Sequence, residues 1–210
     1  MTRLITEGFE AGHLESGYFS GFDISSGFAA SGMYSAGLYP GARIILPNPK
    51  PTHIFVKFAA YGPYVWGMRF ALRNGLNEII KAVRNGNFFD YYINGVKQSQ
   101  GRSYFAANWT VFEFMLFLGS SGAIQVRVGG ILDFMWTGDL SMYPTIDDVY
   151  LDHSPYGYNW LSIDDVVIND NMGPQDDSWP GDRRILPLIP INNGSSSGLV
   201  GSDGDQNNNY

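Results

Sequence analysis

Cysteine is absent from the 210-residue sequence, which excludes disulfide bonds, thiolate zinc sites and cysteine nucleophiles. A chain of this length buries roughly 70% of its unfolded surface, so its core needs no covalent cross-link. No apolar run is long enough to span a bilayer. The N-terminal residues, which include Glu7, Glu10 and Glu15, contain no signal-peptide core. We therefore expect no signal peptide and no membrane partner, and a protein made soluble in the cytoplasm of the cell that synthesises it.

Positive charge is scarce and unevenly placed. Residues 1–100 hold nine Lys and Arg against six Asp and Glu, a balance of +3. Residues 101–210 hold four against fourteen, a balance of −10, and the two halves sum to the net charge of −7. Because the chain has no basic stripe, nucleic acid is not an expected partner.

Motifs for the common catalytic chemistries are missing. Glycoside hydrolysis needs two carboxylates flanking the scissile bond, but the apolar segment 109–118 offers only Glu113. We expect Glu113 to lie on the solvent side, facing Arg127. No Gly-x-Ser-x-Gly, phosphate-binding or dinucleotide-binding motif occurs. The sequence therefore predicts a protein that is not an enzyme and has no cofactor.

Glycine, proline and aromatic residues are abundant, with 26 Gly, 11 Pro, 14 Phe, 13 Tyr and 5 Trp. This composition is typical of many short strands joined by turns. We expect a loop over residues 12–31 and a turn at Pro40-Gly41. A strand is preferred to a short helix at 78–84. Alternating apolar residues and turn signals predict strands at 3–9, 33–39, 42–46, 53–60, 68–73, 78–84, 88–93, 131–136, 148–152 and 160–168.

The segment 108–128 predicts two antiparallel strands around a Gly-Ser-Ser-Gly turn. If Phe114 lies opposite Val126, both apolar rows face one core, and Glu113 then lies opposite Arg127. The first of these strands is apolar on its other face as well. We therefore expect a central strand of a sandwich, with its second face covered by loops or by another chain.

The sequence changes character after Asn169, where it becomes acidic, turn-rich and then low in complexity. We expect a sandwich domain over residues 1–170 and an extended C-terminal tail over residues 171–210. The tail has too few apolar residues to fold alone, so it wraps the domain or docks on a neighbouring subunit. The expected interaction residues are Ile185, Leu186, Leu188 and Ile189.

Trp109 leads an expected strand that is followed by a turn and by the strand at 124–128, and a late strand carries the pair Asp164-Asp165. These two patterns resemble the concanavalin-A-like, laminin-G-like jelly rolls. Gly129-Gly130 replaces the Asp-Gly usual in that superfamily, which removes a carboxylate. The resemblance implies an all-β, concanavalin-A-like jelly-roll β-sandwich.

The closing segment 179–190 is similar to bacteriophage structural proteins, in which a Gly-Asp-x-Arg segment and a Leu-x-Pro follow the last lectin strand. This resemblance implies a non-enzymatic virion structural protein, either a capsid decoration protein or a tail protein. It would attach through the faces of the sandwich and the C-terminal tail. Its partners would be capsid or tail subunits and further copies of itself, and its location would be the virion.

A calcium site is a weaker candidate. Asp147, Asp148, Asp164 and Asp165 offer the hard oxygen ligands that calcium prefers, but their spacing is not that of a calcium loop. Hydrogen bonds to turn amides explain the pair Asp164-Asp165 equally well.

The alternative function is a carbohydrate-binding adhesion module, on a virion or a cell surface, that binds host glycans. Aromatic rings stack on the faces of pyranose sugars, although most rings of a cysteine-free sandwich must lie in its core. The loop aromatics proposed to contact a glycan are Tyr64, Trp66, Tyr156 and Tyr158.

Overall fold

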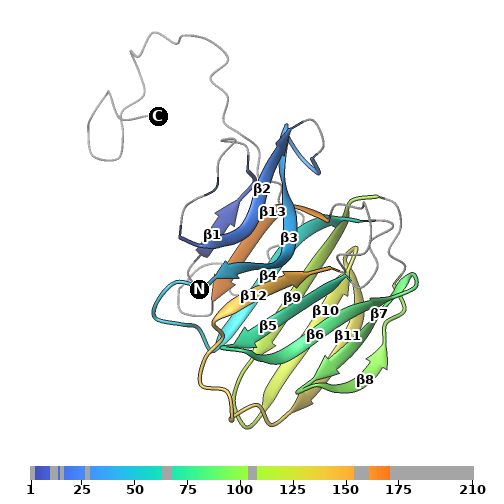
Figure 1. Ribbon diagram of the computed structural model, residues 1–210. Helices are drawn as coiled ribbons and strands as arrows, with labels where there is room; N and C mark the ends of the chain where they lie inside the picture. Colours follow the sequence, from blue (N-terminus) through green and yellow to red (C-terminus); the bar gives the residue numbers. More distant parts are fainter. Residues whose placement is uncertain are drawn as a thin grey trace, which may run out of the picture.

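The structure, a computed structural model, describes residues 3–9, 14, 17–26, 29–62, 68–103, 108–153 and 161–170. These ranges contain strands and no helix, and so no helix that could cross a membrane. The strands are β1 (Arg3–Glu7), β2 (Phe19–Ser26), β3 (Tyr34–Ile45), β4 (His53–Tyr61), β5 (Arg69–Asn74), β6 (Asn77–Asn85), β7 (Phe88–Ile93), β8 (Val96–Gln100), β9 (Thr110–Phe117), β10 (Gly122–Val128), β11 (Ile131–Gly138), β12 (Asp148–Asp152) and β13 (Ser162–Asp170) (Figure 1).

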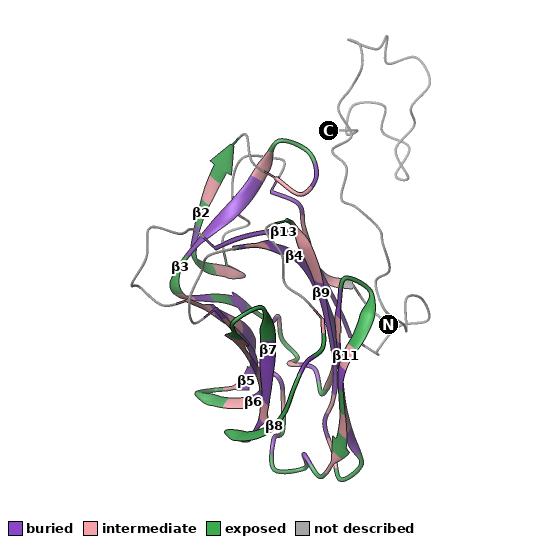
Figure 2. Ribbon diagram, turned by 90° about the vertical axis from the view of Figure 1, so that its right-hand side faces the viewer, coloured by how far each residue is buried: buried purple, intermediate pink, exposed green. Residues whose placement is uncertain are grey.

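The strands form two layers that face each other across the core. Along the ladder the order is β11-β10-β9-β4-β13-β3-β12-β5-β6-β7-β8, with β1 beside β13 and β2 beside β3. All of these pairs are antiparallel. We call β11, β10, β9, β4 and β13 the back layer, and β12, β5, β6, β7 and β8 the front layer (Figures 1 and 2). This arrangement confirms the expected all-β jelly-roll sandwich.

Strand β3 connects the two layers. Its first half pairs with β13 at Ala36 and Gly37, and its second half pairs with β12 from Ala42 onward. Gly41 lies between the halves with φ 81°, a left-handed conformation that suits glycine. The expected turn at Pro40-Gly41 is therefore wrong. The chain bends there and changes partner without leaving the ladder.

Two strands were not expected from the sequence. β2 lies within the expected loop 12–31, and β8 follows β7 directly. Phe22 is the buried residue of β2, and every residue of β8 is exposed. Neither strand carries the alternation of apolar and polar residues that sequence patterns detect.

The central hairpin has the expected register. Phe114 lies opposite Val126 and Glu113 opposite Arg127, and β9 also pairs with β4 on its other side. The preference for a strand at 78–84 is confirmed by β6, whereas the last strand begins at Ser162 rather than at residue 160. The expected tail, including Ile185, Leu186, Leu188 and Ile189, lies outside the described residues.

Aromatic rings fill the centre of the core. Phe58 on β4 is fully buried, and its ring centroid lies 5.0 Å from that of Phe70, 5.7 Å from that of Phe112 and 6.1 Å from that of Phe114. Phe70 belongs to the front layer and the other three belong to the back layer. Phe58 therefore joins the two layers through ring contacts as well as through buried area.

Replacing Phe58 by alanine is expected to lower the free energy of unfolding by about 3–5 kcal/mol, because it leaves a cavity between the layers. The control is Phe88→Ala, at a side chain that is partly exposed to solvent, where a loss of about 1 kcal/mol or less is expected. Chemical denaturation of both variants measures the difference. Equal losses would contradict the assignment of Phe58 to the centre of the core.

Candidate functional site

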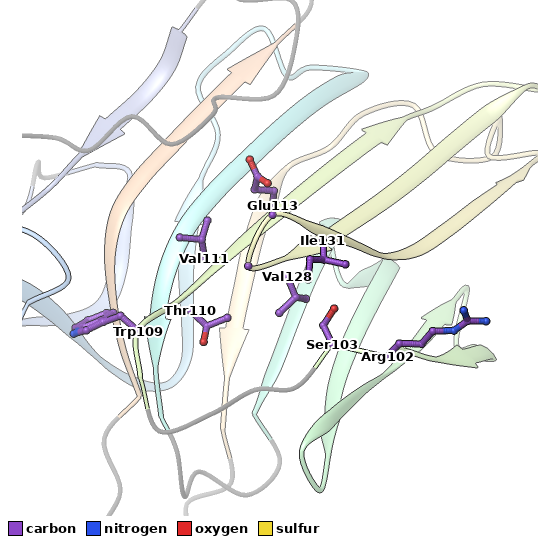
Figure 3. Close-up of a pocket in the computed structure, with 10 residues that line it drawn as sticks. Arg102, Ser103, Trp109, Thr110, Val111, Glu113, Val128 and Ile131 are labelled. Carbon is purple, nitrogen blue, oxygen red and sulfur yellow. The ribbon is translucent and has the colours of Figure 1, made fainter.

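A pocket opens at the end of the back layer where β9 begins and β10 turns into β11 (Figure 3). Its volume is about 610 Å³, which is enough for a small organic ligand. Three separate segments line it: the residues after β8, the start of β9 and the β10–β11 turn. The lining residues are Arg102, Ser103, Trp109, Thr110, Val111, Glu113, Val128, Gly129, Gly130 and Ile131.

Asp133 on β11 holds one wall of the pocket in place. Its Oδ1 accepts hydrogen bonds from the backbone N–H groups of Arg102 (2.7 Å) and Ser103 (2.5 Å). Its Oδ2 accepts a hydrogen bond of 2.6 Å from the Tyr91 hydroxyl. Burial and this hydrogen bond to Asp133 raise the pKa of Tyr91 well above its usual value, so Tyr91 stays protonated and remains a donor. A Cβ at Gly101 would lie 1.9 Å from Asp133 Oδ2, so this close approach requires glycine.

A second wall is the turn Gly129-Gly130. Both residues have positive φ angles, 60° and 78°, as a two-residue hairpin turn requires. The N–H of Gly129 donates to the carbonyl of Val111 at 2.8 Å, which ties the turn to β9. The Gly-Gly sequence thus suits the turn geometry and places no side chain on this part of the pocket.

The start of β9 supplies the side chains that can recognise a ligand. Trp109 is half-buried, and its ring centroid lies 5.8 Å from that of Tyr61 on β4. Figure 3 places Trp109 and Arg102 at opposite sides of the group, with Thr110 and Ser103 between them. The pocket thus offers one large ring, two hydroxyls and a cation within a single volume.

Glu113 is the one carboxylate among the lining residues. The expectation that it faces solvent is wrong, because only 6% of its surface is exposed. It lies on the outer face of the back layer, directly opposite Lys57 on β4 and Arg127 on β10.

The acidic candidates for calcium divide between two structural networks. In the front layer, Asp148 makes a bidentate ion pair with Arg73, with both N–O distances 2.7 Å. Its neighbour Asp147 accepts hydrogen bonds from the Gly75 N–H (2.6 Å) and from the Thr145 hydroxyl (2.9 Å). These carboxylates hold β12 to β5 and to the turn that follows β5.

The second pair, Asp164-Asp165, fastens β13 to the segment before β3. Oδ2 of Asp164 accepts hydrogen bonds from the N–H groups of Ala30 (2.9 Å) and Ser31 (3.1 Å), and Oδ1 accepts one from the Asp165 N–H (2.7 Å). Asp165 Oδ1 accepts one from the Ser31 hydroxyl at 2.7 Å. The hydrogen-bonding interpretation of this pair is confirmed. Within the ranges the structure describes, no group of three or more His, Asp or Glu side chains could hold a metal ion.

The proposed glycan contacts Tyr64, Trp66, Tyr156 and Tyr158 lie outside the described residues. Sequence reasoning noted Trp109 only as the start of a strand and missed Arg102 and Ser103 as site residues. A tryptophan at the beginning of a strand, close to a Gly-Gly hairpin turn, is the signal that could have indicated Trp109. No local sequence pattern indicates Arg102, whose backbone is held by Asp133, a residue about thirty positions further along the chain.

The fold defines the class: the chain is an all-β protein with a concanavalin-A-like jelly roll. No protein-family model and no curated protein matches its sequence. Among solved structures it is similar to the cellulose-induced protein Cip1, with TM-score 0.59 and 13% identity, over 79% of this chain and 96% of that one. It is also similar to an endo-β-1,4-glucuronan lyase from the fungus Trichoderma reesei, with TM-score 0.57 and 10% identity, over 80% and 96% of the two chains.

A third similar structure is the receptor-binding domain of a botulinum neurotoxin of mosaic serotype C/D, with TM-score 0.57 and 10% identity. The match covers 79% of this chain and 47% of that one. The three likenesses extend over most of this chain, but their sequence identities are low. They therefore show the fold alone.

Asp164 makes the stability of the fold depend on pH. Burial raises the pKa of Asp164 to about 7, whereas an aspartate in an unfolded chain titrates near pH ~3.9. Between these values the folded protein keeps a proton that the unfolded chain has lost, so stability falls as pH rises from about 4 to about 7. Asp164→Asn is expected to reduce this fall.

Denaturant unfolding at several pH values between about 4 and 8 measures the effect, because this range spans the pKa values of Asp164 in the unfolded and the folded chain. Asp23→Asn, at an exposed position of β2, is the control and is expected to keep the pH dependence of the original protein. An unchanged pH dependence in Asp164→Asn would contradict the assignment.

Proposed function

We propose that the protein is a non-enzymatic carbohydrate-binding module that binds a glycan in the pocket beside Trp109. The observation that carries this proposal is the combination of groups in the pocket. The indole offers an apolar face to the C–H groups of a sugar ring, and Ser103, Thr110 and Glu113 offer hydrogen-bonding groups to its hydroxyls. A mostly apolar pocket with a few placed polar groups is the usual form of a small-molecule site.

The similar structures support the same class of ligand. The glucuronan lyase acts on a polysaccharide, as its name states, and the match covers 96% of its chain. Arg102 at the rim of the pocket adds a positive charge that a uronic acid carboxylate could approach. Glycans that contain uronic acids therefore belong among the first ligands to test.

The described residues that line the pocket include one carboxylate rather than two, and this supports binding without hydrolysis. Hydrolysis of a glycosidic bond uses two carboxyl groups, about 5–5.5 Å apart in retaining enzymes and about 6.5–9.5 Å apart in inverting enzymes. Among the described lining residues that carboxylate is Glu113, which lies opposite Lys57 and Arg127 on the two neighbouring strands. We expect incubation with glucuronan to give no hydrolysis products.

The virion role expected from the sequence depends on residues 179–190, which the structure does not describe. None of the three similar proteins named above is a virion protein. We therefore place glycan binding ahead of virion attachment. The two proposals are compatible, because a glycan-binding module on a virion surface would satisfy both.

Trp109→Ala is expected to weaken glycan binding at least tenfold, about 1.4 kcal/mol, because the sugar loses its stacking surface. A glycan array that includes glucuronan oligosaccharides and neutral β-glucans identifies the ligand, and calorimetry with that ligand measures the loss. The control is Tyr39→Ala, an exposed aromatic residue on β3 outside the pocket, which is expected to bind normally. Equal binding by the original protein and by Trp109→Ala would exclude the pocket, and no binding on the array would contradict the function.

A further inference from the structure

The outer face of the back layer is more deeply buried than a solvent-facing sheet surface. In one row across the strands, Asn169 on β13 faces Phe55 on β4, which faces Met115 on β9. The row continues to Gln125 on β10 and Met135 on β11. Asn169 and Phe55 are buried and Met115 is 9% exposed, whereas Met135 is 61% exposed. Burial therefore decreases from β13 toward β11.

The neighbouring row shows the same gradient. Val167, Lys57 and Glu113 are buried on β13, β4 and β9, Arg127 on β10 is half-buried, and Leu132 on β11 is exposed. An antiparallel sheet in a two-layer sandwich ordinarily leaves one face to solvent. Two rows that are buried over the same three strands indicate a cover on this face that does not extend to β11.

The described strands do not supply this cover. The inner face of the back layer carries the main core. Figure 2 shows the back layer nearly edge-on, and no coloured segment lies on its outer side. Phe55 and Met115 form a separate apolar cluster with Phe117 and Ala123 packed against it. A partner for this face must therefore bring apolar side chains to the cluster and reach the charged row of Lys57, Glu113 and Arg127.

The chain after β13 starts at the border of this face. Asp170, the last residue of β13, pairs with Ile54, the neighbour of Phe55 on β4. The fifteen residues 171–185 reach up to roughly 50 Å when extended. Strands lie about 4.8 Å apart, so β9 is only about 10 Å from β13 across the sheet.

Residues 185–191, Ile-Leu-Pro-Leu-Ile-Pro-Ile, are the longest apolar stretch after β13. Pro187 and Pro190 favour an extended backbone and lack N–H donors. Such a segment cannot form a regular strand at a sheet edge, but it can lie across a sheet face through its side chains. Asp182, Arg183 and Arg184 precede it and offer both signs of charge to the charged row.

We infer that residues 185–191 of this chain dock on the outer face of β13, β4 and β9, over the cluster of Phe55 and Met115. The inference is independent of glycan binding. It also identifies the surface on which the expected interaction residues Ile185, Leu186, Leu188 and Ile189 act. The docked segment would lie beside the pocket, because Glu113 belongs both to the buried row and to the pocket lining.

Methionine oxidation by hydrogen peroxide, followed by peptide mass spectrometry, tests the inference on the full chain. Met115 reports on the covered face, the exposed Met135 reports on the uncovered strand β11, and the fully buried Met68 reports on the core. In the double variant L188D/I189D, Met115 is expected to oxidise at least threefold faster, with Met135 and Met68 unchanged. The matched control L199D/V200D places the same charges elsewhere in the tail. In this control, Met115 is expected to oxidise as slowly as in the original protein.

Continued protection of Met115 in L188D/I189D would overturn the inference. So would protection of Met115 in the original protein that disappears on dilution, because a second copy of the chain would then be the cover. If Met68 also becomes reactive, the variant has unfolded, and a disulfide cross-link in an otherwise unchanged chain then tests the docking. Because the chain has no cysteine, the pair Gln125→Cys and Leu188→Cys introduces its only thiols. An intramolecular disulfide is expected for this pair and none for Ile45→Cys with Leu188→Cys, since Ile45 is an exposed residue on β3 beside β12. Equal yields, or no disulfide in either pair, would contradict the docking.

Discussion

The alternation of side chains along β9 is the constraint on which the rest of the structure depends. Phe112, Phe114 and Leu116 face the core, whereas Glu113 and Met115 face outward. A shift of one residue against β4 or β10 would exchange these two sets. The same register therefore sets the aromatic core, places Glu113 at the pocket and leaves Met115 on the covered face. The core gives this register a large energetic advantage, because each misplaced phenylalanine would lose its buried area.

The pocket depends on polar interactions at the end of the sandwich rather than on the core. Asp133 accepts two backbone N–H groups and one hydroxyl, and hydrogen bonds to a charged acceptor are stronger than neutral ones. It thereby fixes Arg102 and Ser103 against the start of β9. Gly101 permits the close approach, and Gly129-Gly130 forms a second wall. The groups that line the pocket are therefore held by strands and by two short anchored connections, an arrangement that would limit the entropy lost when a ligand binds.

The sequence predicted the parts of the fold whose side chains alternate between a buried and an exposed face. The register of β9 against β10 was predicted correctly, because Phe114 and Val126 can share one core only in that register. β2 and β8 were missed because their side chains are mostly exposed and carry no such pattern. The bend in β3 was taken for a turn, because Pro40-Gly41 cannot show from sequence alone that the chain continues into a second layer.

The candidate site was less predictable for a different reason. Arg102, Trp109 and Gly129 come from three segments, and the hydrogen bonds of Asp133 to the backbone of Arg102 and Ser103 tie the first of these segments to β11. The aspartates of β12 and β13 attracted attention as possible ligands, yet Arg73 and the amides of Ala30 and Ser31 already occupy their oxygens. A carboxylate in a sequence does not indicate whether its partner will be a side chain, an amide or an ion.

The most direct test of the central claim is a nuclear magnetic resonance titration of the isotope-labelled full-length protein with the strongest glycan ligand from the array. The account predicts that the indole N–H of Trp109 and the amides of Arg102, Ser103, Gly129 and Gly130 shift together with one dissociation constant. Shifts confined to the front layer, for example around Tyr150 and Arg69, with the Trp109 signal unchanged, would contradict it.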